Sequence, residues 1–177
     1  MRTIHDILTN INSEVGTALK YPKATYYAQA ELQVKDGKTF PLVNNGNTIG
    51  FAISLDSKEA LQTYHRVLSS ETETDWTKGK GKFPYKMRTY TIRMVWLGTT
   101  KRLQTRCYDS NDDVKNDVYN ALPTILQQKE IIRTVSENVN KNEVMESEFS
   151  GNITKQLSLD VIAFWIDYEI KQNIKCN

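Results

Sequence analysis

The residues with the clearest chemical character lie between positions 78 and 106, where lysine and arginine are concentrated. This segment holds nine of the 23 basic residues and none of the 21 acidic ones, so the rest of the chain is net acidic. Four aromatic residues, Phe83, Tyr85, Tyr90 and Trp96, are interleaved with the basic ones. The basic residues are Lys78, Lys80, Lys82, Lys86, Arg88, Arg93, Lys101, Arg102 and Arg106. The pattern predicts a basic hairpin, with a Lys-Gly-Lys-Gly-Lys tip, that projects from an acidic domain.

Three interpretations of this segment are open. Flexible lysines neutralise a nucleic-acid backbone without reading its sequence, so the hairpin could make non-specific phosphate contacts. Opposite charges also guide protein docking, so it could instead meet an acidic surface of a neighbouring copy, such as the segment 137–148. In the third interpretation the lysines only keep an exposed sheet edge from aggregating. The docking hypothesis assigns the interface to Lys78, Lys80, Lys82, Lys86, Arg88, Glu143, Glu146 and Glu148.

Other clusters of reactive residues have simpler explanations. Four aspartates, at 109, 112, 113 and 117, precede or begin a predicted helix, where the helix dipole favours negative charge. They lack the spacing and the bidentate glutamate of a calcium loop. Neither His5 nor His65 lies near a serine or cysteine in a nucleophile motif. We therefore expect no catalytic residues, no metal site and no cofactor, and the sequence does not indicate an enzyme.

The cysteine content and the apolar pattern suggest a protein made in the cytoplasm. Cys107 and Cys176 are interpreted as free thiols, because two cysteines do not form a secreted disulfide framework. No signal-peptide core and no apolar run of membrane-spanning length is present. We expect a soluble protein with no membrane contact.

The closing strand, residues 159–170, is the element around which the rest is expected to pack. Its even positions, from Ile162 to Ile170, are all apolar or aromatic, and a period of two indicates a strand. Its first half is apolar on both faces, which predicts a strand inside a sheet, with helices on the even face.

The remaining elements follow from periodicity and turn signals. We predict a helix over 3–15, capped by Thr3, and a three-stranded meander with an Asp36–Gly37 turn, in which Pro41 makes the second strand an edge strand or a bulged one. A helix is predicted over 56–68, with a strand over 61–68 as the alternative. Long exposed loops are expected at 69–86 and 140–156. The other predicted elements are strands over 90–96, 103–107 and 131–139 and a helix over 112–122 that ends or kinks at Pro123. The expected fold is one α+β domain over 1–177, with a mostly antiparallel sheet packed by two or three helices.

This order of elements resembles the tail terminator and tail-completion (neck) proteins of tailed bacteriophages. The match runs through the helix 3–15, the meander 26–55, the hairpin 88–106, the helix 112–122 and the closing strand 159–170. The resemblance implies a non-enzymatic virion protein at the head–tail junction or tail end. It implies a homo-oligomeric ring, such as a hexamer or dodecamer, that contacts other neck or tail proteins and is made in the host bacterial cytoplasm. Ring subunits meet through heterologous contacts that close on themselves. The alternative is a nucleic-acid-binding accessory protein that uses the basic segment 78–106.

Overall fold

The computed structural model describes most of the chain. The described ranges are 3–21, 23–44, 49–53, 60–75, 85–103, 111–127, 131–138, 140–149 and 161–174. All seven strands belong to one sheet, in the order β3-β2-β1-β4-β5-β7-β6. Every neighbouring pair is antiparallel except β1 with β4, which is parallel. The fold is α+β with a mostly antiparallel sheet, as the sequence predicts.

The first helix, α1 (Ile4–Leu19), begins where the sequence places it. The Thr3 hydroxyl accepts a hydrogen bond from the backbone N–H of Asp6, and the Asp6 carboxylate accepts one from the backbone N–H of Thr3 at 2.8 Å. This reciprocal capping satisfies two backbone donors that the first turn would otherwise leave unpaired. The helix continues through Gly16, where a Cβ would make a tight contact of 3.3 Å with the Tyr26 ring.

The predicted three-stranded meander is confirmed. It consists of β1 (Ala24–Lys35), β2 (Lys38–Asn44) and β3 (Ile49–Ala52). Asp36 and Gly37 have positive φ values of 53° and 72°, as a tight hairpin turn requires. Pro41 does not place β2 at the sheet edge, since β2 pairs on both sides. The pairing of β2 with β1 is unbroken through Pro41, and the register shift against β3, between Leu42 and Asn44, places the extra residue in β3, so the predicted bulge at Pro41 is not present in β2.

The helix predicted over 56–68 is wrong over its described part. Residues Leu61–Asp75 form β4, a long strand that pairs antiparallel with β5 (Tyr85–Thr99) and parallel with the start of β1. The error has a physical cause. Leu61, Tyr64 and His65 are all fully buried, because both faces of β4 are covered, and a strand buried on both faces shows no clean alternation.

The predicted loop 69–86 is also largely wrong, because β4 extends to Asp75 and β5 begins at Tyr85. The tip of this hairpin, 76–84, lies outside the described residues. The return strand expected from Leu103 is contradicted, since Leu103 ends the short helix α2 (Thr100–Leu103); residues 104–107 lie outside the described ranges. The long hairpin is therefore β4–β5. Gly98 allows β5 to pass close to the start of β4, because a Cβ at this position would lie 2.3 Å from the Ala60 carbonyl oxygen.

The last third of the chain follows the prediction with two corrections. Helix α3 (Asn111–Gln127) continues past Pro123 rather than ending at Leu122. The predicted strand β6 (Ile131–Asn138) is present. The predicted loop 140–156 instead contains helix α4 (Lys141–Glu148), which Asn140 caps by accepting a hydrogen bond from the N–H of Asn142 at 3.2 Å. The closing strand is β7 (Val161–Ile174), between β5 and β6.

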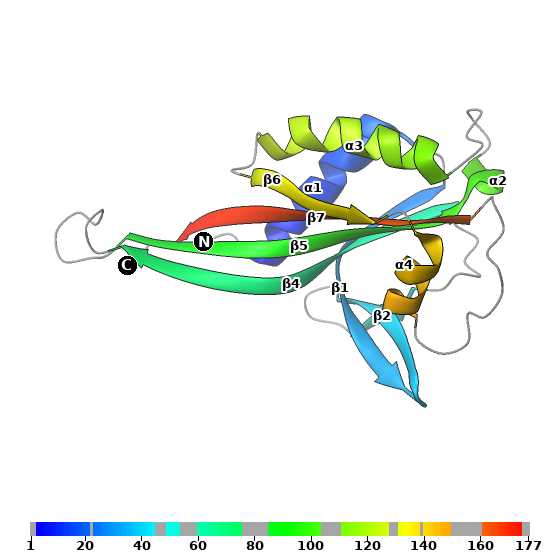
Figure 1. Cartoon of the computed structure of the whole chain (residues 1–177), viewed down its shortest axis with the longest axis horizontal. Helices are drawn as coiled ribbons and strands as arrows, with labels where there is room; N and C mark the ends of the chain where they lie inside the picture. Colours follow the sequence, from blue (N-terminus) through cyan, green and yellow to red (C-terminus); the bar gives the residue numbers. More distant parts are fainter. Residues whose placement is uncertain are drawn as a thin grey trace.

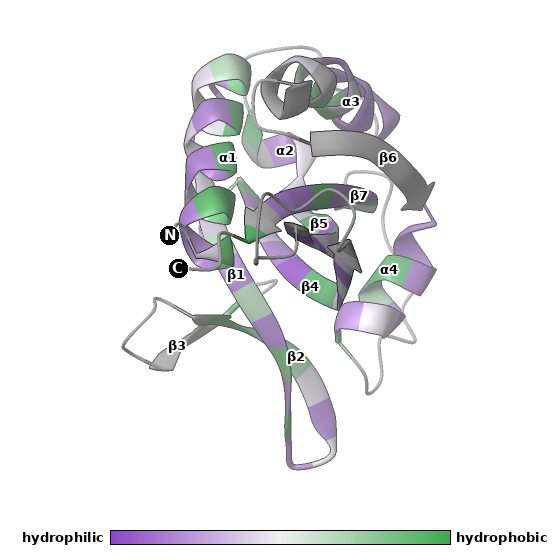
Figure 2. Ribbon diagram, turned by 90° about the vertical axis from the view of Figure 1, so that its left-hand side faces the viewer, coloured by the Kyte–Doolittle hydropathy of each residue, from purple (hydrophilic) through white to green (hydrophobic). Residues whose placement is uncertain are grey.

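Two hydrophobic clusters lie on opposite faces of the sheet. Figures 1 and 2 show α1 and α3 on one side of the sheet and α4 on the other. Helices α1 and α3 cover one face, which we call the helix face, and the even residues of β7 from Ile162 to Ile170 point into it. Helix α4 covers part of the other face, which we call the α4 face, through Val144 and Met145. The prediction of a closing strand inside the sheet, with helices on its even face, is confirmed.

Candidate functional site

Three strands of the sheet extend well beyond the helices. β4, β5 and β7 continue together past the end of α1 and form a narrow projection (Figure 1). We call this projection the arm and define it as residues 69–75, 85–89 and 171–174. Seven residues of β4 correspond to a reach of about 20 Å. Because neither hydrophobic cluster contains arm residues, the arm contributes little to the core and is the part of the described chain best placed to meet a partner.

A β-bulge at the base of the arm decides which side chains share a face. Val67 lies opposite Ile92, but Ser69 lies opposite Thr91, so Leu68 is an extra residue in β4. Such an insertion reverses the facing of every later side chain in its strand. In an uninterrupted ladder Glu71 would lie opposite Arg88, and Glu73 opposite Lys86. The bulge instead pairs Glu71 with Thr89 and Glu73 with Met87, which places the acidic residues on the other face from the basic ones.

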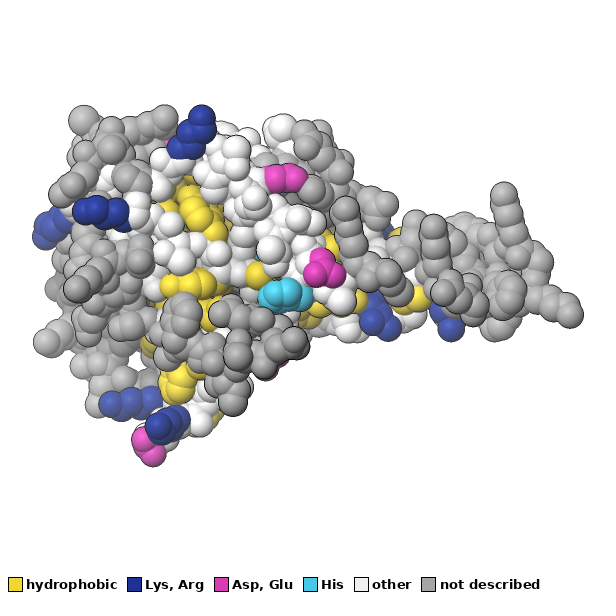
Figure 3. Space-filling model, turned by 180° about the vertical axis from the view of Figure 1, so that it is seen from behind, with side chains coloured by type: hydrophobic (Ala, Val, Ile, Leu, Met, Phe, Trp, Pro, Cys, Tyr) yellow, Lys and Arg dark blue, Asp and Glu magenta, His cyan; other side chains and the backbone are white. Residues whose placement is uncertain are grey.

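The helix face of the arm is basic. Lys86 lies opposite Thr74 of β4 and Ile174 of β7, and Arg88 lies opposite Thr72 and Gln172. The Arg88 Nε donates a hydrogen bond to the Thr72 hydroxyl at 3.2 Å, which fixes the guanidinium on this face. Arg88 is exposed and Lys86 is half-buried. In Figure 3 basic side chains lie along the arm.

The α4 face of the arm carries the acidic residues. Glu71 and Glu73 are both exposed and lie two residues apart on β4. Met87 lies opposite Glu73 and is half-buried. Lys171 is the one described basic residue on this face of the arm, opposite Thr89. The arm thus has two faces of different charge. The helix face carries Lys86 and Arg88, and the register places Glu71, Glu73 and Asp75 with Lys171 on the α4 face.

The residues predicted to form an interface are not all brought together. Lys78, Lys80 and Lys82 belong to the segment 76–84, outside the described residues. Lys86 and Arg88 lie on the arm, as predicted, and Glu143 and Glu146 are exposed on α4. Sequence reasoning did not single out Glu71 and Glu73. Their alternation along a strand was hidden because they belong to a segment predicted to be a loop. Their separation from Lys86 and Arg88 depends on the Leu68 bulge.

Glu148 does not face a neighbour and is removed from the predicted interface. Its side chain is fully buried and pairs with the guanidinium of Arg66. It also accepts a hydrogen bond from the Tyr64 hydroxyl at 2.8 Å. Burial, reinforced by this carboxylate, raises the pKa of the Tyr64 hydroxyl well above its usual value. The cluster ties the end of α4 to the middle of β4, so Glu148 has a structural role.

A second ion pair removes Arg93 from the basic surface. Its Nε and Nη2 atoms donate hydrogen bonds of 2.8 Å each to the two carboxylate oxygens of Asp167 on the neighbouring strand. The guanidinium carbon also lies 3.8 Å from the centre of the Trp165 ring. Because this cation is paired and stacked within the chain, the basic segment 78–106 is not one continuous binding surface.

Beneath α1 and α3, the helix face contains several buried polar groups. His65 is fully buried, with its ring edge-on to Tyr168 at 5.9 Å between centroids. Burial lowers the pKa of His65 to about 3 and raises the pKa of Tyr168 above its ordinary value. Neither ring nitrogen of His65 has a hydrogen-bond partner within the described structure. A neutral imidazole surrounded by aromatic and aliphatic side chains is a core residue rather than a catalytic base.

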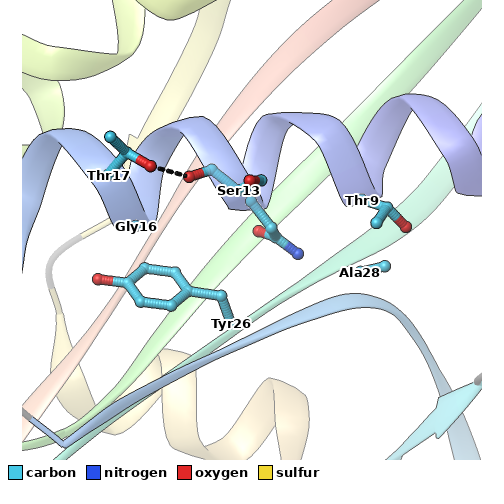
Figure 4. A pocket seen from close by; sticks show the side chains of 7 residues that line it. Thr9, Ser13, Gly16, Thr17, Tyr26 and Ala28 are labelled. Atoms are coloured by element: carbon cyan, nitrogen blue, oxygen red, sulfur yellow. Dashed lines mark hydrogen bonds between the residues drawn. The ribbon is translucent and has the colours of Figure 1, made fainter.

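A shallow pocket of about 470 Å³ lies between α1 and the first half of β1 (Figure 4). Thr9, Ser13 and Thr17 border it from the helix, and the Tyr26 ring lies below Gly16. The Asn12 amide also lines the pocket and donates a hydrogen bond to the Tyr27 carbonyl. The lining is uncharged, so the pocket does not provide a titratable pair for catalysis.

Within the described ranges, no group of three or more histidine, cysteine, aspartate or glutamate side chains is placed to hold a metal ion. Of the aspartates predicted at the start of a helix, Asp112 and Asp113 lie in the first turn of α3, and Asp109 lies outside the described residues. Asp117 accepts a hydrogen bond from the Tyr21 hydroxyl at 3.1 Å. None of the described helices has the length and apolar character that spanning a membrane requires. The chain matches no model of a known protein family, and no curated protein is significantly similar to it.

Proposed function

We propose that this protein is a structural subunit of a tailed bacteriophage that forms an oligomeric ring at the head–tail junction or at the end of the tail. The observation that carries the proposal is the arm. Three paired strands leave the body, and their described residues carry charged side chains on both faces, with Glu71, Glu73 and Arg88 exposed. An element that contributes little to its own core is explained if a second chain covers it.

The order of elements supports the same proposal. A capped N-terminal helix, a meander, a long hairpin, a packed helix and a closing strand occur in the sequence expected from the resemblance to tail terminator and neck proteins. The hairpin is formed by β4 and β5 rather than by residues 88–106. In this part the resemblance is one of element type and not of residue positions. Docking of charged surfaces onto one another is the mode of action, with no chemical step.

The proposal is tested by the solution mass and the shape of the purified chain. We expect light scattering to give one discrete mass, that of a hexamer or dodecamer, and negative-stain microscopy to show closed rings of that size. A population of open, indefinitely growing filaments, or a monomer under all salt conditions, would overturn the ring.

The second candidate is an accessory protein that binds nucleic acid through Lys86, Arg88 and the lysines of the hairpin tip. The specific observation in its favour is the placement of Lys86 and Arg88 on one face of the arm. Such binding would weaken steeply with added salt and would need no partner protein. A salt titration with fluorescent double-stranded DNA separates the candidates, because a ring subunit should bind free DNA weakly at moderate salt.

A further inference from the structure

We infer that the partner of the arm is the arm of a second copy of this chain, stacked so that the basic helix face of one arm contacts the acidic α4 face of the next. The inference rests on the proposed assembly function and names its interface. In this arrangement Lys86 and Arg88 contact Glu71 and Glu73 of the neighbouring copy, and not the acidic residues of its α4.

Charge complementarity is the first argument. Lys86 and Arg88 lie two residues apart on β5, and Glu71 and Glu73 lie two residues apart on β4. Side chains at i and i+2 of a strand share a face and are about 7 Å apart, so the two pairs have the same spacing. When one arm lies over the next, two cations can therefore meet two carboxylates at once. An exposed ion pair contributes little to stability in water, so these pairs provide orientation more than affinity.

Apolar side chains at matching positions supply the second argument. Ile174 lies beside Lys86 on the helix face, and Met87 lies beside Glu73 on the α4 face. Both are half-buried in the single chain. A stacked neighbour would bring an isoleucine from one arm against a methionine from the other and remove both from water. Burial of apolar surface is favourable and, unlike an exposed ion pair, is not screened by salt, so this contact supplies affinity where the charges supply orientation.

The Leu68 bulge is the third argument. Without it, Glu71 and Glu73 would lie opposite Arg88 and Lys86 within the same hairpin, and the arm would neutralise its own charges. The bulge prevents this pairing and gives each face a separate charge. Because the two faces differ, each contact is heterologous, and a heterologous contact generates a ring when the rotation from copy to copy closes.

Face stacking also fits the arm better than pairing of strand edges. In the described residues, β1 pairs with β4 only as far as His65, and β6 pairs with β7 only as far as Ile170, so both outer strands of the arm lack a neighbour. The outer strand β4 alternates glutamate with serine and threonine there, and charged side chains discourage edge-to-edge pairing.

Charge reversal on each face separately tests the inference. E71K/E73K makes the acidic face basic, and K86E/R88E makes the basic face acidic; each should reduce the wild-type oligomer to monomers in light scattering. The matched control is E143K/E146K, which makes the same charge change on exposed residues of α4 and should leave the mass unchanged. Circular dichroism and thermal unfolding confirm that all variants are folded.

Mixing supplies the decisive readout. Equal amounts of E71K/E73K and K86E/R88E should assemble together, since every face then meets its opposite, and the quadruple variant E71K/E73K/K86E/R88E should assemble by itself. K171E, which removes the one basic residue described on the α4 face of the arm, should raise the salt concentration at which the oligomer dissociates. Purely structural damage would not be rescued by mixing.

The outcomes separate the inference from the proposed function. If both reversed variants keep the wild-type mass, or if only E143K/E146K dissociates, arm stacking is overturned while the ring proposal stands. If folded reversed variants dissociate but neither the mixture nor the quadruple variant assembles, arm stacking is overturned as well. A wild-type chain that is monomeric under all salt conditions overturns both.

Discussion

The two halves of the long strands β4, β5 and β7 have the same backbone pairing but opposite side-chain environments. In the body, Trp96 and Phe164 lie on adjacent strands, fully buried, with their rings stacked at 5.9 Å between centroids. In the arm, the same strands carry glutamate, arginine and threonine, and their β4 residues from Ser69 to Thr74 are exposed. The comparison teaches that hydrogen-bonded strands alone do not define a core. One half stabilises the fold, and the other half is the surface that the proposed assembly would use.

The largest expected effect on stability comes from replacing an isoleucine of β7 by alanine in the body. The same replacement in the arm is the comparison. Ile166 and Ile174 point to the same face of β7, but Ile166 is 1% exposed and Ile174 is only half-buried in the arm. Ile166→Ala should lower the free energy of unfolding by about 4 kcal/mol, because it leaves a cavity in the core. Ile174→Ala should cost less than about 1 kcal/mol in the unassembled chain. Chemical denaturation measures both, and equal losses would contradict the division of the strands.

Gly98 tests how closely the body is packed at the other end of β5. A Cβ there would lie 2.3 Å from the Ala60 carbonyl oxygen, and a backbone atom cannot move aside easily. Gly98→Ala should lower the free energy of unfolding by about 3 kcal/mol. Gly37→Ala in the exposed β1–β2 turn is the comparison, since it introduces backbone strain without any steric contact within 4 Å. A Gly98→Ala protein as stable as the wild type would show that β4 and β5 are less tightly packed than described.

Glu148 tests whether α4 is held by its buried ion pair. Glu148→Gln should lower the free energy of unfolding by about 2 kcal/mol, because it leaves the Arg66 guanidinium without its carboxylate partner. The full cost of a broken buried pair is reduced here, since the Arg66 side chain is 19% exposed and can be hydrated. Hydrogen exchange should show faster opening of residues 141–148. Glu146→Gln, on the exposed side of α4, should change neither quantity.

The pH dependence of stability tests the burial of His65. Its pKa is lowered to about 3 in the folded chain from an ordinary value of 6.5, so between these values the unfolded chain binds a proton that the folded chain does not. This contribution is fully present above pH 6.5 and is lost as the pH falls toward 3. At pH 5 the loss should be about 2 kcal/mol relative to pH 7. His65→Leu should remove that part of the pH dependence, whereas His5→Gln should retain it.

The sequence predicted the elements whose periodicity is simple. The capped first helix, the meander and the closing strand all show a clear period of 3.6 or 2, and the structure confirms them. The sheet interior could not be predicted in the same way. β4 is buried on both faces near Leu61, although Gln62, Thr63 and His65 are polar, and it is polar on both faces beyond Leu68, so no single period runs through the strand.

The candidate site was predictable only in part. The concentration of basic residues identified Lys86 and Arg88 directly. The ion pairs of Arg93 and Glu148 could not be predicted from the sequence, because their partners, Asp167 and Arg66, lie 74 and 82 residues away along the chain. The grouping of Glu71 with Glu73 on a face of its own depends on the Leu68 bulge, a one-residue shift with no sequence signature of its own.

The measurement that tests the central claim most directly is light scattering of E71K/E73K and K86E/R88E, first separately and then mixed, at low and moderate salt. Arm stacking predicts monomers for each variant alone and an oligomer of wild-type size, with equal amounts of the two chains, for the mixture. Separate variants that both retain the wild-type mass, or a mixture that stays monomeric although both chains are folded, would contradict it.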